Sequence, residues 1–162
     1  MNEMMIRKLE KTEIKQAFPL VYEVFCEYEA DNYPEDGKHA FRDAIYSEDF
    51  LDMLSAFGAF EEDRLVGIIA TRNEGRHVAL FFVDGDYHRK GIGRKLWDAV
   101  LEDSTAEEIT VNSSEYAVNI YRKLGFEQAE NLREENGIRF VPMVYRACRQ
   151  EDSDFCKWEM NC

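Results

Sequence analysis

Two glycines among basic residues form the stretch of this chain with the clearest chemical meaning. Gly91 and Gly93 follow an apolar segment that ends at Val83, and they open a predicted amphipathic helix. Four basic side chains surround them: Arg89, Lys90, Arg94 and Lys95. The first N–H groups of a helix have no acceptor within it and lie at the positive end of its dipole, and glycine lets a bound group come close to them. The stretch therefore predicts a binding site for phosphate or pyrophosphate.

Two common phosphate-binding loops do not fit this stretch. The P-loop requires Lys and then Ser or Thr directly after its last glycine, and here Ile92 follows Gly91. The dinucleotide fingerprint requires a small residue where Leu96 stands. A glycine-containing turn with a solvated basic face is the structural alternative to an anion site.

A second stretch, residues 112–126, follows a short apolar segment at residues 109–111. Apolar and aromatic side chains recur in it at a spacing typical of a short buried helix: Val118, Ile120, Tyr121 and Leu124. Gly125 predicts a left-handed end to this helix, and Phe126 begins a further strand.

Together the two stretches resemble motifs A and B of the GNAT superfamily of N-acetyltransferases. Motif A is an apolar strand followed by Arg/Gln-x-x-Gly-x-Gly/Ala and a helix, and here His88 stands at the Arg/Gln position. Motif B is Asn-x-x-Ala leading to Tyr and an apolar-Gly-Phe ending, and here Ser114 replaces the Asn. The matching residues of motif B are Ala117, Tyr121, Gly125 and Phe126. The resemblance spans residues 5–146.

The resemblance implies that the cofactor is acetyl-CoA, with its pyrophosphate at the glycine loop. The pantetheine arm is then expected where the strand ending at Val83 splays away from the strand at residues 109–111. There it would pair with the backbone of Phe81 and Val83 as a further strand would. The residues expected to contact the cofactor are Phe81, Phe82, Val83, His88, Arg89, Lys90, Gly91, Ile92, Gly93, Arg94, Lys95, Asn112, Ser114, Ala117 and Tyr121.

The resemblance also implies an N-acetyltransferase that moves the acetyl group directly to a primary amine in a ternary complex. Such a transfer needs a neutral amine, good alignment and a proton for the departing thiolate. Tyr121 holds the position whose hydroxyl approaches the CoA sulfur in relatives, so it is the predicted general acid. His77 lies where some relatives carry a glutamate base, and imidazole can serve as a base near neutral pH. A tyrosine packed on the sheet and a structural histidine are the alternatives.

Two other functions are compatible with the sequence. A CoA-binding regulatory module would keep the fold with little catalysis, and an acyltransferase could use a longer acyl-CoA. The presence of Tyr121 favours an enzyme, although fold and cofactor do not identify the acceptor. A covalent cysteine relay is disfavoured because Cys26 lies in a predicted helix and the other three cysteines are near the C-terminus.

The charge of the chain is strongly acidic and uneven. Its net charge of −13 argues against a nucleic-acid partner. Residues 31–63 hold ten acidic and two basic side chains, which predicts a cationic amine acceptor, either a small molecule or a peptide. Candidate contacts at the end of the first helix are Glu27, Glu29, Asp31 and Tyr33. A solvated acidic surface is the alternative interpretation.

The length of 162 residues suits a single domain. We expect that domain over residues 1–148, a monomer or homodimer, and an acidic cysteine-containing tail over residues 149–162. No stretch approaches the roughly 20 apolar residues of a membrane helix, and the N-terminus lacks the features of a secretory signal. The sequence therefore predicts a cytoplasmic protein with no membrane contact. The four cysteines lack metal-ligand spacing, so no metal site is predicted.

The residue pattern predicts a single-domain α/β fold. The expected order is a strand, two helices, three strands, the glycine-loop helix, a strand, a short helix and two strands, and it matches the GNAT order of a mixed, mostly antiparallel sheet flanked by helices. Thr12 is expected to cap the first helix, and Pro19 to kink or split it. Of the last two strands, at residues 126–133 and 137–146, the second contains Pro142, which indicates an edge or bulge.

Overall fold

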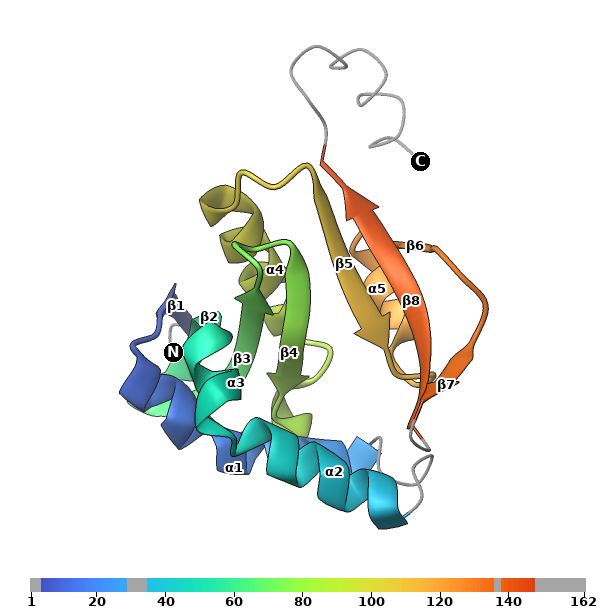
Figure 1. The fold of residues 1–162 in the computed structure, drawn as a ribbon. Coiled ribbons are helices and arrows are strands. Elements are labelled where there is room, and N and C mark those ends of the chain that lie inside the picture. The colour runs from blue at the N-terminus through green and yellow to red at the C-terminus, as the bar shows by residue number, and fades with distance from the viewer. Residues whose placement is uncertain (1–3, 29–34, 136–137, 148–162) are drawn as a thin grey trace, which may run out of the picture.

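An eight-stranded sheet crosses the molecule in the order β1-β2-β3-β4-β5-β8-β6, with β7 paired to β8 outside this path (Figure 1). The computed structural model describes residues 4–28, 35–135 and 138–147. The strands are β1 (Met4–Lys8), β2 (Ser55–Glu61), β3 (Arg64–Arg72), β4 (His77–Val83), β5 (Glu108–Ser113), β6 (Glu127–Gln128), β7 (Arg133–Glu135) and β8 (Ile138–Arg146). The β4–β5 pair is parallel and the other strand pairs are antiparallel. The predicted α/β fold with a mixed, mostly antiparallel sheet is confirmed.

Helices cover both faces of this sheet. The helices are α1 (Lys11–Tyr28), α2 (Glu35–Ile45), α3 (Glu48–Met53), α4 (Ile92–Asp103) and α5 (Val118–Lys123). In Figure 1, α2 and α3 lie in front of the strands, and α4 and α5 lie behind them. Side chains of successive strand residues point to opposite faces, so each face has its own buried cluster. None of the helices in the described ranges is long and apolar enough to span a membrane.

The two clusters are built around aromatic rings. Behind the sheet, Trp97 of α4 is fully buried, and its ring centroid lies 4.9 Å from that of Phe126 and 5.1 Å from that of Tyr145. In front of the sheet, Phe25 of α1 stacks on Phe41 of α2 with centroids 4.0 Å apart. The two clusters fix the helices against the sheet and leave the ends of β4 and β5 to shape a site.

The N-terminal helices differ from the prediction in three ways. α1 begins at Lys11, so Thr12 lies inside its first turn and is not its cap. Pro19 does not split α1, because the buried side chains of Phe18 and Val21 hold the helix on the sheet despite the lost hydrogen bond. α3 was not predicted, since it has only six residues, although Ser47 caps it by accepting a hydrogen bond from the N–H of Phe50.

The C-terminal strands also differ from the prediction. The strand expected at residues 126–133 is replaced by the two short strands β6 and β7. β8 is not an edge strand, because it lies between β5 and β6. Opposite Pro142, the N–H of Ala129 donates to the proline carbonyl at 2.8 Å, but proline has no N–H to return the second bond of an antiparallel pair. This accounts for the end of β6 at Gln128. The expected tail at residues 149–162 lies outside the described residues.

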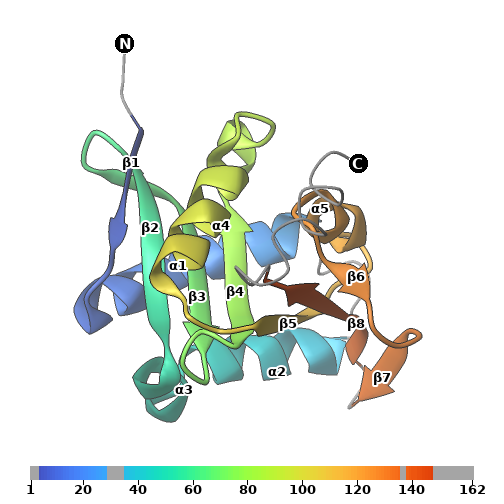
Figure 2. The ribbon, with the colours of Figure 1, turned by 90° about the horizontal axis from the view of Figure 1, so that it is seen from above.

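β4 and β5 diverge soon after they meet, as the resemblance to the GNAT superfamily implied. Their pairing consists of His77 with Thr110 and Val78 with Val111. Beyond these pairs β4 keeps its pairing with β3, and Figure 2 shows it turning away from β5. The N–H of Asp84 donates to the carbonyl of Val66 in β3 at 2.8 Å. Along a strand, the N–H and C=O groups of successive residues point alternately to one edge and to the other. The amide groups of residues 81 and 83 therefore face the gap.

Candidate active site

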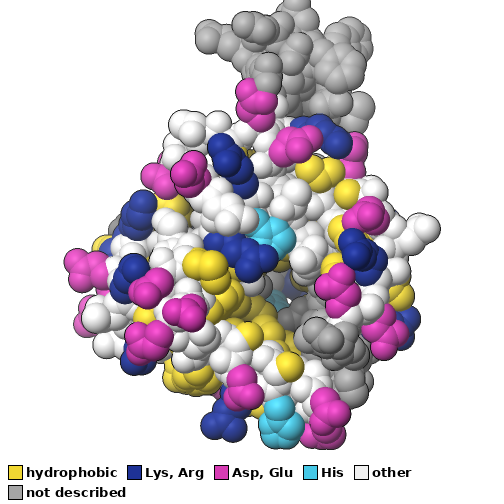
Figure 3. Space-filling model, viewed as in Figure 1, with side chains coloured by type: hydrophobic (Ala, Val, Ile, Leu, Met, Phe, Trp, Pro, Cys, Tyr) yellow, Lys and Arg dark blue, Asp and Glu magenta, His cyan; other side chains and the backbone are white. Residues whose placement is uncertain are grey.

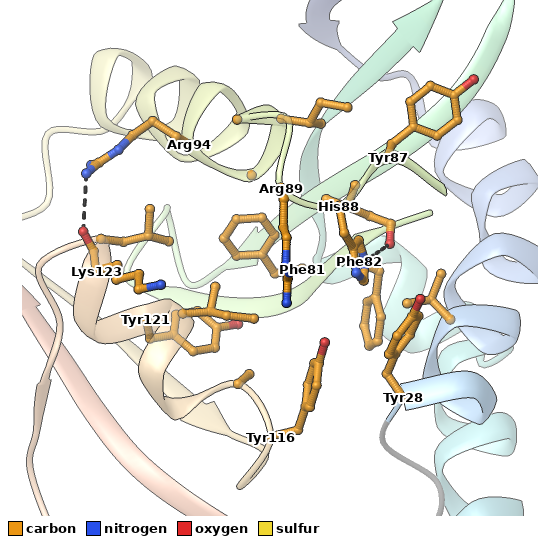
Figure 4. Close-up of a pocket in the computed structure, with 18 residues that line it drawn as sticks. Tyr28, Phe81, Phe82, Tyr87, His88, Arg89, Arg94, Tyr116, Tyr121 and Lys123 are labelled. Carbon is orange, nitrogen blue, oxygen red and sulfur yellow. Dashed lines mark hydrogen bonds between the residues drawn. The ribbon is translucent and has the colours of Figure 1, made fainter. Parts of the chain in front are cut away.

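A cavity of about 450 Å³ lies between the end of β4 and α5, beyond the point where β4 diverges from β5 (Figure 4). One wall is the end of β4 with the loop and first turn of α4 that follow it, and the opposite wall is one face of α5. Val24 and Tyr28 of α1 complete the lining from the front of the sheet. Three separate segments of the chain, within residues 24–28, 81–94 and 116–124, thus meet around one space.

The loop between β4 and α4 is tied down by its own side chains. It starts with a short 3-10 helix, Gly85–Tyr87, in which the carboxylate of Asp84 accepts from the N–H of Asp86 at 3.0 Å. Arg64 pairs with the same carboxylate at 3.1 Å. The Nε2 of His88 lies 2.7 Å from the carbonyl oxygen of Val83. Because a carbonyl only accepts, Nε2 carries the hydrogen and the other ring nitrogen is an acceptor.

The N-terminus of α4 presents backbone N–H groups without a cap. Gly91 precedes the helix with φ +79°, and no side chain caps it. Arg89 also has a positive φ, +63°, and residues with positive φ occur in backbone turns that can direct successive N–H groups toward an anion. The first bond within the helix runs from the N–H of Lys95 to the carbonyl of Gly91 at 3.1 Å. The N–H groups of residues 92–94 consequently have no acceptor within the helix.

Gly93 leaves open space above this helix end. A Cβ there would lie 3.6 Å from the ring of Phe81, an ordinary contact, and the φ of Gly93 is not positive. Glycine at this position is therefore required neither by packing nor by backbone conformation, unlike Gly91. The first turn carries the cations Arg94 and Lys95 and no acidic residue, an unfavourable arrangement at the positive end of a helix unless an anion is present. The residues present fit the pyrophosphate of coenzyme A.

Tyr121 lies on the α5 wall of the cavity, across from the β4 wall that carries Phe81 and Phe82 (Figure 4). Its side chain is 7% exposed. The ring packs edge-on against Phe81, with centroids 5.9 Å apart, and against Phe126, with centroids 5.2 Å apart. Two aromatic neighbours, one in β4 and one just before β6, therefore fix the orientation of this phenol.

The structure does not bring His77 to the cavity. This residue begins β4, where the strand is still paired with β5, and it is not among the residues that line the space. Its Nδ1 lies 2.8 Å from the hydroxyl oxygen of Thr110. Burial, and secondarily the charge of Arg72, lower the pKa of His77 to about 4. His77 is neutral at pH 7, but it lies at the paired start of β4, whereas Tyr121 lines the cavity.

Most of the residues expected to contact the cofactor line the cavity. Those that do are Phe81, Phe82, Val83, His88, Arg89, Gly91, Ile92, Gly93, Arg94, Ala117 and Tyr121. The others are Lys90, Lys95, Asn112 and Ser114, which lie outside the lining. Lys90 stands 5.2 Å above the ring of Tyr87. The buried Ser114 hydroxyl accepts from the N–H of Ala117 at 3.2 Å and shapes the entry into α5.

Several lining residues were not predicted from the sequence. Ile120 and Leu124 lie on the same face of α5 as Ala117 and Tyr121, so their helical spacing was an available signal. Lys123 also lines the cavity, and its carbonyl accepts a bond from Arg94 at 3.2 Å that joins the two walls.

Two tyrosines at the front of the cavity were also missed. The ring of Tyr28 lies 4.7 Å from that of His88 and 5.7 Å from that of Tyr116. Burial, and then the nearby Glu27 carboxylate, raise the pKa of Tyr28, so its hydroxyl keeps its proton at neutral pH. Tyr28 comes from α1, and no local pattern connects it to the glycine loop.

Of the residues expected to bind the substrate, Glu27 alone is described, and it is not among the described lining residues. Glu27 is exposed at the end of α1, and Glu29, Asp31 and Tyr33 lie outside the described residues. Within residues 35–63, three carboxylates pair with lysines: Glu35 with Lys38, Glu48 with Lys15 and Asp52 with Lys11. Figure 3 shows hydrophobic side chains beside the central hollow and acidic ones spread among basic ones farther out. Among the described lining residues there is no carboxylate, and the side-chain charges come from Arg89, Arg94 and Lys123.

Comparison with known proteins identifies similar sequences. Residues 29–147 match the family model described as an acetyltransferase (GNAT) domain. A UPF0039 protein of Schizosaccharomyces pombe is 32% identical over 81 residues, which are 47% of this chain and 54% of that protein. The chain thus matches about half the length of this relative.

Solved structures share the fold over almost the whole chain. A GCN5-related N-acetyltransferase from Rhodopseudomonas palustris has a TM-score of 0.76 and 20% identity, covering 91% of this chain and 98% of that one. The PaiA N-acetyltransferase of Thermoplasma acidophilum, in complex with coenzyme A, has a TM-score of 0.68 and 19% identity over 90% and 99%. FeeM, an N-acyl amino acid synthase from uncultured soil microbes, has a TM-score of 0.66 and 16% identity over 90% and 92%. At these identities the likeness is one of fold.

The low pKa of His77 leads to a prediction about stability. An unfolded chain binds a proton on this histidine near pH 6.5, whereas the folded protein binds it only near pH 4. Between these values the unfolded state holds more protons, so the free energy of unfolding decreases as the pH falls. We expect His77→Gln to make this decrease shallower, as measured by urea unfolding from about pH 7 to about pH 4. His39→Gln, at an exposed position of α2, is the control, and equal slopes for His77→Gln and the parent would contradict the assignment.

Gly93 provides a test of the anion site. Gly93→Glu places bulk and negative charge above the uncapped N–H groups, so we expect affinity for coenzyme A to fall by about 100-fold or more, measured by calorimetric titration. Gly93→Ala adds only the Cβ for which the fold has room, and it should bind coenzyme A and melt like the parent. Normal binding by a folded Gly93→Glu variant would place the anion site elsewhere.

Proposed function

The chain belongs to the GNAT family of acetyltransferases and is an acyltransferase, and from that premise we propose that it transfers an acetyl group from acetyl-CoA to a primary amine. The observation that carries the proposal is the meeting of two features in one cavity. An uncapped helix N-terminus with adjacent cations faces the same space as the tyrosine of α5. The first feature suits a pyrophosphate, and the second suits a leaving sulfur.

The chain offers a continuous path of polar groups for coenzyme A. The N–H groups of residues 92–94, with Arg89 and Arg94, would hold the pyrophosphate. The backbone edge of Phe81 and the N–H of Val83 face the gap and would pair with the amides of the pantetheine arm. The carbonyl of Val83 already accepts a hydrogen bond from His88. Val83 would therefore offer the pantetheine arm its N–H as a donor.

The proposed chemistry is a direct transfer in a ternary complex. When bound, acetyl-CoA supplies the thioester carbon that the amine nitrogen attacks, so that a C–N bond forms, the C–S bond breaks and the amine loses one proton. Tyr121 would donate its hydroxyl proton to the departing sulfur and regain one from solvent. Since His77 lies outside the cavity, we assign the proton lost by the amine to water at the open mouth. The aromatic packing of Tyr121 would keep its donor aligned throughout.

Amine-dependent release of the CoA thiol tests the proposal. Acetyl-CoA should raise the melting temperature by mass action, and a thiol reagent should detect free CoA only when the protein and an accepted amine are both present. Butyryl-CoA and octanoyl-CoA, assayed in parallel, compare acyl lengths. Stabilisation by acetyl-CoA without thiol release across a panel of amines, amino acids and peptides would instead indicate the CoA-binding regulatory module.

The role of Tyr121 is tested by removal of its hydroxyl. Tyr121→Phe keeps the ring and its two aromatic contacts, so we expect kcat to fall by about 10²–10⁴ with little change in affinity for acetyl-CoA. Tyr145→Phe is the matched control, because Tyr145 packs on Trp97 and is not among the described lining residues. This variant should have the kcat of the parent. Near-parental turnover by Tyr121→Phe would make the tyrosine a packing residue.

A further inference from the structure

The cavity reaches both faces of the sheet. Phe81 and Phe82 are neighbours on β4, so their side chains point to opposite faces. Phe81 packs with the cluster behind the sheet, and the ring of Phe82 lies 6.1 Å from that of Phe41 of α2 in front. Both line the cavity together with Val24 and Tyr28 of α1. The space therefore continues past the proposed cofactor path toward α1, where an acceptor would enter.

The front part of this space has an aromatic wall. Tyr28, Tyr116 and Phe82 line it, and Figure 4 shows Tyr28 and Tyr116 side by side at the rim. Tyr116 is 44% exposed and Ile120, also in the lining, is 46% exposed, which makes them two of the large apolar side chains that the fold leaves uncovered. Uncovered apolar surface beside a cavity is typical of a ligand-binding wall.

The carboxylate of Glu27 lies beside this wall, because it is near enough to Tyr28 to help raise the pKa of that tyrosine. The charged side chains of the described lining are Arg89, Arg94 and Lys123, and Figure 4 shows Arg89 reaching into the space from the glycine loop. A second ammonium group on the acceptor would meet no carboxylate among these residues. The acidic residues that suggested a cationic acceptor include three that are paired with lysines outside the cavity.

We propose that the acceptor is a primary amine carried on an aromatic group, and that Tyr116, with Tyr28 and Phe82, contacts its ring. The inference rests on the proposed function, since it names the acceptor class of the same site. Aromatic pairs prefer offset or edge-to-face contacts with centroids about 4.5–7 Å apart, and Tyr116, 44% exposed, can make such a contact with a ligand. The amine would then point from this wall toward the thioester.

A comparison of two amines tests the acceptor class. We expect kcat/KM for 2-phenylethylamine to exceed that for 1,4-diaminobutane by about tenfold or more. Tyr116→Ala should raise KM for 2-phenylethylamine about tenfold while leaving kcat and affinity for acetyl-CoA near the parental values, and Tyr116→Phe should restore KM. Tyr46→Ala, at an exposed tyrosine that does not line the cavity, is the control and should change neither constant.

Binding measurements separate this inference from the proposed function. Calorimetric titration of 2-phenylethylamine into the protein saturated with coenzyme A should show binding that Tyr116→Ala weakens about tenfold, whether or not turnover occurs. Saturation is checked beforehand by titration with coenzyme A, and failure of that titration would overturn both proposals. Coenzyme A binding without binding of 2-phenylethylamine, or a preference for 1,4-diaminobutane that Tyr116→Ala does not alter, would overturn the acceptor class alone.

Discussion

The divergence of β4 from β5 is the constraint on which the rest of the site depends. Two residue pairs join these strands, and β4 then continues to Val83 paired with β3. A strand edge released in this way presents N–H and C=O groups that require partners, and His88 satisfies one of them at the Val83 carbonyl. Because α4 follows β4 and α5 follows β5, the same divergence places these two helices on opposite walls of one cavity. The bond from Arg94 to the carbonyl of Lys123 then joins the walls at one end.

The sequence predicted those parts of the fold that are set by periodicity over many residues. The long helices α1 and α4 and the strands β2 to β4 have strong repeating patterns, and they occur in the expected order. α3 was too short for its period to be recognised, and its single clear signal was the cap at Ser47. The break between β6 and β7 depends on the pairing of Ala129 with Pro142, a contact between strands that neither segment reveals alone.

The candidate site also has parts that a local sequence pattern reveals and parts that only the fold brings together. The glycine loop was recognisable because its backbone requirements are local, as the positive φ of Gly91 illustrates. Tyr28 reaches the cavity only because α1 packs against β4. No sequence pattern near Tyr28 therefore predicts that it belongs to the site. His77 illustrates the opposite case. Six residues of extended strand span about 20 Å, so a residue at the paired start of β4 has surroundings unlike those of Val83 at its open end.

The whole chain and the cavity carry charges of opposite sign, and the local charge decides what can bind there. The net charge is −13, yet the charged side chains of the described lining are two arginines and a lysine, and the N-terminus of α4 adds to their field. Exposed charges are screened over about 10 Å at 0.1 M salt, so the peripheral carboxylates act weakly on a group held at contact distance inside the cavity. Composition therefore bears on large polyanionic surfaces such as nucleic acid, where many charges sum over distance. It could not give the sign of the charge on a ligand in a small cavity. That sign depends on a few N–H and guanidinium groups that only the fold brings together.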